Sequence, residues 1–190
     1  MAEARIGFAV TGSFCTFKAV FPQMRRLVEA GYDVTPIMSQ NAYETDTRFG
    51  RAADWVRMGE EITGKAVIHT IAQAEPIGPK KLLDLLIIAP CTGNTLGKLA
   101  CGIYDTAPTL AVKSHRRNDG PVLIAVSTND ALAASAGSIG MLQARKGMFF
   151  VPYAQDDAAG KPCSCVADFE KILPAAQAAL AGRQLQPVIF

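Results

Sequence analysis

An apolar run in the middle of the chain, Leu85–Ala89, constrains the fold more than any other feature. The run is too short for a free-standing helix and is apolar at every position, which is typical of a strand covered on both faces of a parallel sheet. It ends at Pro90, a small polar turn follows from Cys91 to Thr95, and apolar residues then return at helical spacing up to Ile103. A strand, a polar turn and a helix in this order bring backbone amides and hydroxyls together outside the carboxyl end of a sheet, which predicts a ligand site there.

The same succession of strand and polar turn recurs along the chain. The three further pairs are Arg5–Thr11 with Gly12–Thr16, Asp33–Met38 with Ser39–Asn41, and Pro121–Val126 with Ser127–Asp130. Four predicted strands therefore end in turns that carry hydroxyl groups.

Segments with apolar residues at helical spacing separate these strands. The predicted helices are a segment from Phe17 to Gly31 with a kink or a late start at Pro22, then Ala42–Met58, Ala131–Lys146 capped by Asn129 or Asp130, and Val166–Leu180. The remaining segments are a short strand or extended stretch Ala66–Ile71, a last strand Met148–Pro152, and the loops Glu75–Lys81 and Ala154–Pro162. The alternation predicts one domain over residues 1–190 with an α/β fold: a doubly wound parallel sheet in a Rossmann-like or flavodoxin-like three-layer arrangement.

Composition excludes several classes of function. A net charge of +2 argues against nucleic acid or an anionic membrane as the partner. Met1–Arg5 is short and charged, and the apolar stretch after it is broken at Thr11–Ser13, so neither a signal peptide nor a membrane span is predicted and we expect the chain in the cytoplasm. The five cysteines include no C-x-x-C pair and there are only two histidines, so we expect free thiols and no metal site.

Two common nucleotide-binding motifs are missing. The glycine spacing G-x-G-x-x-G of a dinucleotide site does not follow the first strand, and Gly97-Lys98 lacks the glycine-rich loop of a P-loop. What remains is a first turn with Gly12, Ser13 and Thr16 at a helix start, which suits one phosphate. With Ser39 at the second strand end, this pattern indicates a mononucleotide site, and simple helix capping explains the same residues equally well.

The central stretch also carries a family motif. Ala89-Pro90-Cys91-Thr92-Gly93-Asn94-Thr95, followed by Lys98-Leu99-Ala100 and Gly102-Ile103, resembles the A-P-A-[ST]-A-N-T…K-L-A-x-G-I motif of the flavin-dependent cysteine decarboxylase (HFCD) family of flavoproteins. The resemblance implies an FMN cofactor. It implies phosphate contacts from the turn at Gly12 and from Ser13, Thr16 and Ser39, and contacts to the flavin or the substrate from Thr92, Asn94, Thr95 and Asn129.

Two differences from the decarboxylase pattern indicate that the chain resembles another branch of the family more closely. Gly93 replaces the usual alanine, and Ser127-Thr128-Asn129 stands in place of a Pro-x-Met-Asn loop. The implied branch contains synthase subunits that oxidise a cyclic dihydro-dicarboxylate to an aromatic one. This branch implies a partner subunit resembling a nicotinamide-binding dehydrogenase, a homo-oligomer, and a place in the mother cell of a sporulating bacterium.

Several roles stay open at this stage. We expect His69 to be the catalytic base, because an imidazole titrates near neutral pH. Asn94 is the second residue that we expect to be catalytic. The basic cluster, defined as Lys113, His115, Arg116 and Arg117, either neutralises a dicarboxylate or is a solvated loop. Ala154–Pro162 is either a lid or a plain loop. The alternatives in function are a flavin-dependent decarboxylase of a cysteine-derived carboxylate and a non-catalytic subunit with a vestigial flavin pocket.

Overall fold

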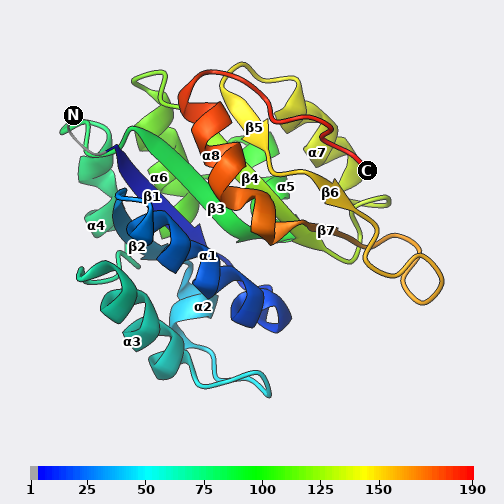
Figure 1. Ribbon diagram of the computed structural model, residues 1–190, viewed down its shortest axis with the longest axis horizontal. Coiled ribbons are helices and arrows are strands. Elements are labelled where there is room, and N and C mark those ends of the chain that lie inside the picture. The colour runs from blue at the N-terminus through cyan, green and yellow to red at the C-terminus, as the bar shows by residue number, and fades with distance from the viewer. Residues whose placement is uncertain (1–3) are drawn as a thin grey trace.

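The computed structural model describes residues 4–190, which fold around a single sheet (Figure 1). The strands are β1 Arg5–Val10, β2 Asp33–Met38, β3 Leu85–Cys91, β4 Val122–Thr128, β5 Met148–Phe150, β6 Tyr153–Ala154 and β7 Cys165–Ala167. Five of them run parallel in the order β2-β1-β3-β4-β5. β7 pairs antiparallel with the end of β4, and β6 pairs antiparallel with β7. The predicted doubly wound parallel sheet is confirmed.

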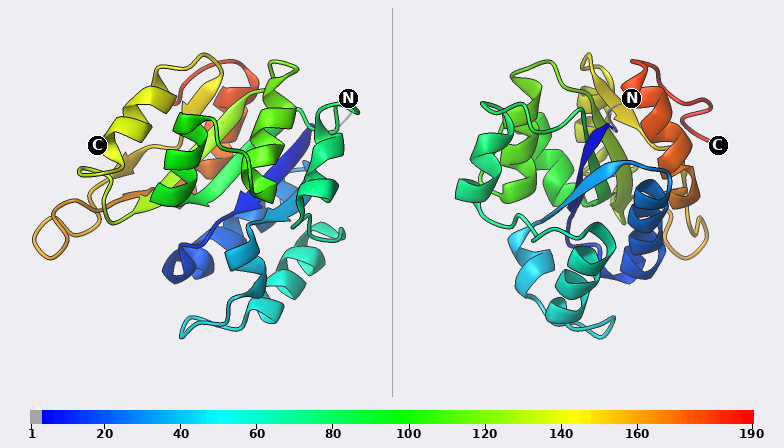
Figure 2. Two further views of the ribbon diagram at one scale, coloured as in Figure 1. Left: turned by 180° about the vertical axis from the view of Figure 1, so that it is seen from behind. Right: turned by 60° about the vertical axis from the view of Figure 1, so that its left-hand side comes forward.

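Helices cover both faces of this sheet, as the three-layer prediction requires. They are α1 Phe17–Glu29, α2 Gln40–Glu44, α3 Ala52–Thr63, α4 Ile71–Ala74, α5 Gly93–Cys101, α6 Ala107–Arg116, α7 Ala136–Gln143 and α8 Ile172–Leu180, with the short 3-10 helices η1 Phe14–Thr16, η2 Glu75–Ile77 and η3 Phe169–Lys171. α1 and α8 lie on one face, and α4, α5 and α6 lie on the other (Figure 2). No helix among residues 4–190 combines the length and apolar character needed to cross a membrane.

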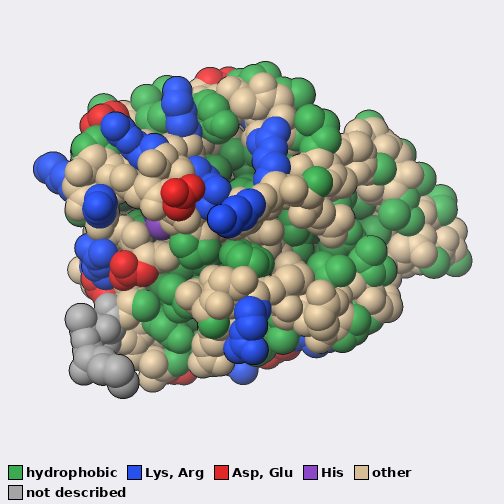
Figure 3. Space-filling view, turned by 90° about the horizontal axis from the view of Figure 1, so that it is seen from above, with side chains coloured by type: hydrophobic (Ala, Val, Ile, Leu, Met, Phe, Trp, Pro, Cys, Tyr) green, Lys and Arg blue, Asp and Glu red, His purple; other side chains and the backbone are tan. Residues whose placement is uncertain are grey.

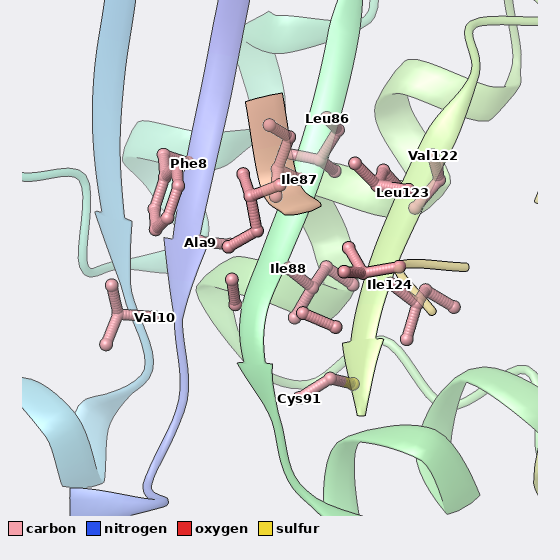
Figure 4. Packing of buried hydrophobic residues seen from close by; sticks show 14 of the residues in the cluster. Phe8, Ala9, Val10, Leu86, Ile87, Ile88, Cys91, Val122, Leu123 and Ile124 are labelled. Carbon is pink, nitrogen blue, oxygen red and sulfur yellow. The ribbon is translucent and has the colours of Figure 1, made fainter. Parts of the chain in front are cut away.

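The centre of the sheet forms the core. Every residue of β3 is buried, and β4 is buried up to its last residue. Figure 4 shows side chains of β1, β3 and β4, among them Phe8, Ile87 and Leu123, packed together. The prediction of a central strand at Leu85–Ala89 is therefore confirmed, because a strand apolar on both faces is stable only with helices on each side.

The single helix predicted over Ala42–Met58 is wrong. α2 ends at Glu44, a loop follows, and α3 begins at Ala52. Gly50 has a φ of +148°, which is incompatible with a helix, and the Asp46 carboxylate accepts a hydrogen bond from the Ala52 amide at 2.8 Å. The late start predicted for the first helix is wrong as well, because α1 begins at Phe17 and continues through Pro22.

Two further helices begin later than predicted. The predicted cap at Asn129 or Asp130 is wrong, because Asp130 lies in a turn in which its carbonyl accepts the Ala133 and Ser135 amides, and α7 starts only at Ala136. The last helix, α8, begins at Ile172 rather than Val166, because Cys165–Ala167 is a strand that pairs with the end of β4. This β6–β7 hairpin, whose loop projects from the sheet in Figure 1, was missed.

The strand order positions the functional edge. From β1 the chain crosses to β2 on one side, whereas the later strands β3, β4 and β5 add on the other side. In open parallel sheets ligands bind outside the carboxyl ends of the strands where this reversal occurs, here between β1 and β3.

Candidate functional site

The four polar turns meet at the carboxyl edge of the sheet, where two hollows open beside each other. The larger cavity has about 660 Å³ and lies beyond β1, β3 and β4. The smaller cavity has about 370 Å³ and lies beyond β1, β2 and β3. Gly12, Thr92 and Asn94 line both, so the cavities adjoin. Each volume is within the range of sites for small organic ligands.

Thr11 fixes the boundary between the ends of β1 and β3. Its hydroxyl donates to the Pro90 carbonyl at 2.7 Å and accepts a hydrogen bond from the Thr92 amide at 3.1 Å. The Thr11 amide also donates to the Pro90 carbonyl, at 3.3 Å. Because Thr11 is buried, these bonds hold the start of the motif turn at a fixed distance from the first turn.

Asn94 is free to contact a ligand, because it does not cap its helix. The N-cap of α5 is Thr92, whose hydroxyl accepts a hydrogen bond from the Thr95 amide at 3.3 Å and contacts the Thr95 hydroxyl at 3.0 Å. The Asn94 side chain is exposed and makes no hydrogen bond to any residue between 4 and 190. Asn94 is therefore not the cap of α5, and it lines both cavities.

The three residues expected at a phosphate divide between the cavities. Ser13 and Thr16 line the larger cavity, where the Thr16 hydroxyl donates to the Ser13 carbonyl at 2.8 Å. Ser39 lines the smaller cavity and caps α2, since its hydroxyl accepts from the Ala42 amide at 3.3 Å. A single ligand can contact Ser13, Thr16 and Ser39 only if it extends from one cavity into the other at Gly12, which lines both. We call this place the junction.

The end of β4 supplies the far wall of the larger cavity. The Ser127 hydroxyl lies 2.8 Å from the Ser13 hydroxyl and so joins β4 to the first turn. Asn129 is exposed, lines the larger cavity and has no side-chain hydrogen bond to the described residues. Two unpaired amide side chains, those of Asn94 and Asn129, thus face the same space.

Asp130 forms a compact polar cluster against the start of α5. One of its carboxylate oxygens, Oδ1, accepts hydrogen bonds from the Thr128 hydroxyl at 2.5 Å and from the Ser135 hydroxyl at 2.8 Å. A Cβ on Gly93 would lie 2.6 Å from Ser135 Oγ, 2.8 Å from Thr128 Oγ1 and 2.9 Å from Asp130 Oδ1. The alanine usual in the decarboxylases therefore does not fit here, which links the two departures seen in the sequence.

His69 lies outside both cavities. It follows Ile68, which bridges to Ile37 at the outer edge of the sheet, and its ring stacks on Tyr43 with centroids 3.7 Å apart. Its backbone amide donates to the Gln73 side chain at 2.9 Å. His69 therefore lies beside α2, the helix that Ser39 caps, but it lines neither cavity.

The basic cluster lies at the opposite end of the sheet, near the start of β4, on the end of the molecule seen in Figure 3. It is helical rather than a loop, because α6 extends to Arg116. His115 is buried with Nε2 3.0 Å from the Pro121 carbonyl, and Arg116 donates to the Gly120 carbonyl at 2.9 Å. These residues fix the turn into β4 and line neither cavity.

Sequence reasoning missed several residues of the larger cavity. Phe49, assigned to a helix, lies in the loop before α3 and lines the cavity. Asp156 and Lys161, in the loop Ala154–Pro162, also line it and form a salt bridge at 3.1 Å. The position of the loop after the last parallel strand could have indicated that it lies at the cavity. Nothing indicated this for Phe49, because the residue was assigned to a helix.

The electrostatics of the larger cavity combine two carboxylates and one ammonium. Hydrogen bonding from Thr128 outweighs burial and lowers the pKa of Asp130. Burial alone would raise the pKa of Asp156, but bonds from Ser164 and Lys161 outweigh it and lower the value. The Asp156 carboxylate in turn raises the pKa of Lys161. All three groups are charged at neutral pH. Cys91 is fully buried, and this burial raises the pKa of its thiol, so it is a small core side chain.

A family model described as Flavoprotein matches residues 1–165 of the chain. The chain belongs to this flavoprotein family. Over 185 residues it is 44% identical to the B subunit of dipicolinate synthase from Bacillus subtilis, an alignment that covers 97% of this chain and 92% of that protein. The resemblance drawn from the central motif is thus confirmed.

Solved structures agree with the sequence relatives of this flavoprotein. The crystal structure of the dipicolinate synthase B subunit from Bacillus halodurans superposes with a TM-score of 0.91 at 41% identity, covering 100% of this chain and 97% of the other. The FMN-dependent cysteine decarboxylase SpaF superposes with a TM-score of 0.70 at 23% identity, covering 95% and 98%. At that identity the second likeness speaks only for the fold.

The residues present fit a flavin mononucleotide. The smaller cavity offers hydroxyls and an amide, from Ser39, Thr95, Thr106 and Asn41, which suit a phosphate and a sugar-like chain. The larger cavity offers the unpaired side chains of Asn94 and Asn129 beside the aromatic rings of Phe14 and Phe49, which suit a flat ring with polar edges. The junction at Gly12 joins the two halves.

Proposed function

We propose that this flavoprotein binds FMN and acts as the B subunit of dipicolinate synthase, in the oxidation of dihydrodipicolinate to dipicolinate during sporulation. The observation that supports this most is the likeness, along nearly the whole chain, to two Bacillus proteins of that name. The unpaired amides of Asn94 and Asn129 in one cavity support a ligand role for this edge of the sheet. FMN, when bound, supplies a hydride acceptor.

The polar end of the cofactor is assigned to the hydroxyl groups around the junction. Gly12, Ser13 and Thr16 precede α1, and Ser39 precedes α2, so the backbone amides of two helix starts lie near these hydroxyls. Thr92 and Thr95 contribute from the start of α5. These side chains orient the phosphate and exclude water from it.

The substrate is assigned to the larger cavity as well, next to the flavin ring. Among residues 4–190, Lys161 supplies the ammonium group of this cavity, and Asn94 and Asn129 supply amide donors, which together suit a dicarboxylate. Phe49 offers a ring face for a planar substrate. Asn94 lines both cavities, and so we propose that it positions the ring that gives up hydrogen beside the ring that receives it.

The partner and the assembly belong to the same proposal. A relative named as the B subunit of a synthase implies a second protein, and we propose the A subunit of dipicolinate synthase, which resembles a nicotinamide-binding dehydrogenase, in the cytoplasm of the mother cell. Copies of this chain would form a homo-oligomer, and this homo-oligomer would bind the A subunit. Light scattering on the chain alone and on its mixture with the A subunit tests both points, and a monomer in both samples would contradict them.

An FMN titration tests the cofactor. At a concentration one hundred times its Kd, FMN should stabilise the fold by about 2.7 kcal/mol, which corresponds to a rise of roughly 5–11 °C in Tm for a chain of this size. Asn94→Ala should reduce this rise while the unliganded Tm stays the same, because Asn94 makes no hydrogen bond within the described residues. A colourless protein with an unchanged Tm would refute the flavin and favour the vestigial pocket.

Dihydrodipicolinate oxidation, assayed with the A subunit in the presence and absence of this chain, tests the reaction. We expect turnover to depend on this chain. Release of carbon dioxide from a peptide with a carboxyl-terminal cysteine, without oxidation of dihydrodipicolinate, would instead identify a decarboxylase.

A further inference from the structure

The larger cavity contains a carboxylate that the cofactor and substrate assignments leave unused. Asp130 lines this cavity, and only its Oδ1 is engaged, by Thr128 and Ser135. The other oxygen, Oδ2, makes no hydrogen bond to the residues from 4 to 190, and none of their salt bridges involves Asp130. A carboxylate that lines a cleft and forms no salt bridge with the described residues is suited to receive a proton or a hydrogen bond from a ligand.

The position of this carboxylate is rigidly determined. Two hydroxyls hold Oδ1, and the cluster fits against the Cα of Gly93, where a Cβ would overlap all three oxygen atoms. The start of α5 carries a partial positive charge that favours an anion at this point. Asp130 therefore has a fixed orientation before any ligand binds, which is the property that proton transfer requires of a base.

We propose that Asp130, rather than His69, is the catalytic residue that accepts the proton lost when the ring becomes aromatic. This inference rests on the proposed function. His69 lies outside both cavities and stacks on Tyr43, whereas Asp130 lies beside Asn94 and Asn129 in the cavity assigned to the substrate.

The step balances as follows. One ring carbon of dihydrodipicolinate gives up a hydride, with both electrons of its C–H bond, to a flavin or a nicotinamide. The neighbouring ring carbon gives up a proton to Asp130 Oδ2, and the electron pair of that C–H bond becomes the new ring double bond. Because the product is aromatic, the proton leaves readily, so a carboxylate is a sufficient base.

The environment of Asp130 determines how the rate should depend on pH. Thr128 and Ser135 keep Asp130 ionised well below neutral pH, and the charged groups that share its cavity are Asp156 and Lys161. An Asp130 base therefore gives a rate that stays level from pH 7.5 to roughly pH 5.

The test compares Asp130→Asn with the wild-type chain, both in the complete enzyme with the A subunit of the synthase and FMN. The substitution keeps the shape and removes the base, so turnover should fall by a factor of roughly 10²–10⁴. Asp54→Asn is the matched control, because Asp54 pairs with Arg57 on α3 and lines neither cavity. The control should keep wild-type turnover.

Binding separates a base from a structural residue. Dipicolinate carries two negative charges, so calorimetry should show that it binds Asp130→Asn as tightly as wild type or more tightly, with FMN retention unchanged. Wild-type turnover in Asp130→Asn would overturn the proposal, as would a rate that falls between pH 7.5 and roughly pH 5 together with a loss of activity in His69→Ala. Loss of dipicolinate binding and a lower Tm in Asp130→Asn would also overturn it, in favour of a purely structural role. Absence of oxidation by the wild-type enzyme would instead refute the proposed function itself.

Discussion

Replacing Gly93 by alanine should destabilise the protein, although alanine is the better helix former. The new methyl group would lie 2.6–2.9 Å from three oxygen atoms, those of Ser135, Thr128 and Asp130, and so the polar cluster must move. Overpacking of this kind costs about 1–3 kcal/mol. For a chain of this size each kcal/mol lowers Tm by roughly 2–4 °C, and we therefore expect a loss of roughly 2–12 °C in a calorimetric scan.

Gly97→Ala is the matched control for this experiment. Gly97 lies in the same helix, α5, and a Cβ there meets no atom within 4 Å. Alanine should stabilise that position by about 0.5–1 kcal/mol, which raises Tm by roughly 1–4 °C. A Gly93→Ala variant that melts at or above the wild-type temperature would show that the cluster is mobile, and the rigid placement of Asp130 would then be refuted.

Three further changes test other parts of the structure. Gln184→Ala should cost about 1–3 kcal/mol in urea unfolding, because the Gln184 side chain is the partner of both the amide and the carbonyl of Phe150, at 2.8 and 2.6 Å; an unchanged midpoint would mean that water replaces it. Thr11→Val keeps the shape but removes the bonds to the Pro90 carbonyl and the Thr92 amide, so a loss of about 1–3 kcal/mol is expected, and equal stability would show that the link between β1 and β3 is dispensable. Burial lowers the pKa of His115, so the unfolded chain binds this proton more readily than the folded one; the contribution of His115 to stability should decline as the pH falls below roughly 6.5, and His115→Asn should show a shallower decline between pH 7 and 5.5.

The sheet could be predicted from the sequence because its strands are marked locally. Leu85–Ala89 is apolar on both faces, and the turn after each strand is polar, so both the parallel sheet and its functional edge followed from the residues alone. The polar residues at that edge are marked locally in the same way, and Ser13, Ser39 and Asn94 line the cavities there.

What the sequence could not predict depends on distant contacts. The strand Cys165–Ala167 has too few residues for a periodic signal and exists only because it pairs with Ser127 and Thr128. Asp130 looked like a helix cap because a turn and a cap use the same residue types. Its partner Ser135 is five positions further on, and the fit against Gly93 requires the packed structure.

The β6–β7 hairpin makes the order of synthesis matter for this protein. The first turn of the cavity is complete early in the chain, but Ser13 meets Ser127 across 114 positions, and the opposite rim, with Asp156, Lys161 and Ser164, comes later still. Glu170 then ties this last segment back to α1 through Gln23, at 2.9 Å, and through Arg26. A nascent chain that has built the parallel strands still has an open cleft, because contacts between distant positions form late in folding. A ligand that contacts both rims could therefore bind only after this last segment has been made and folded.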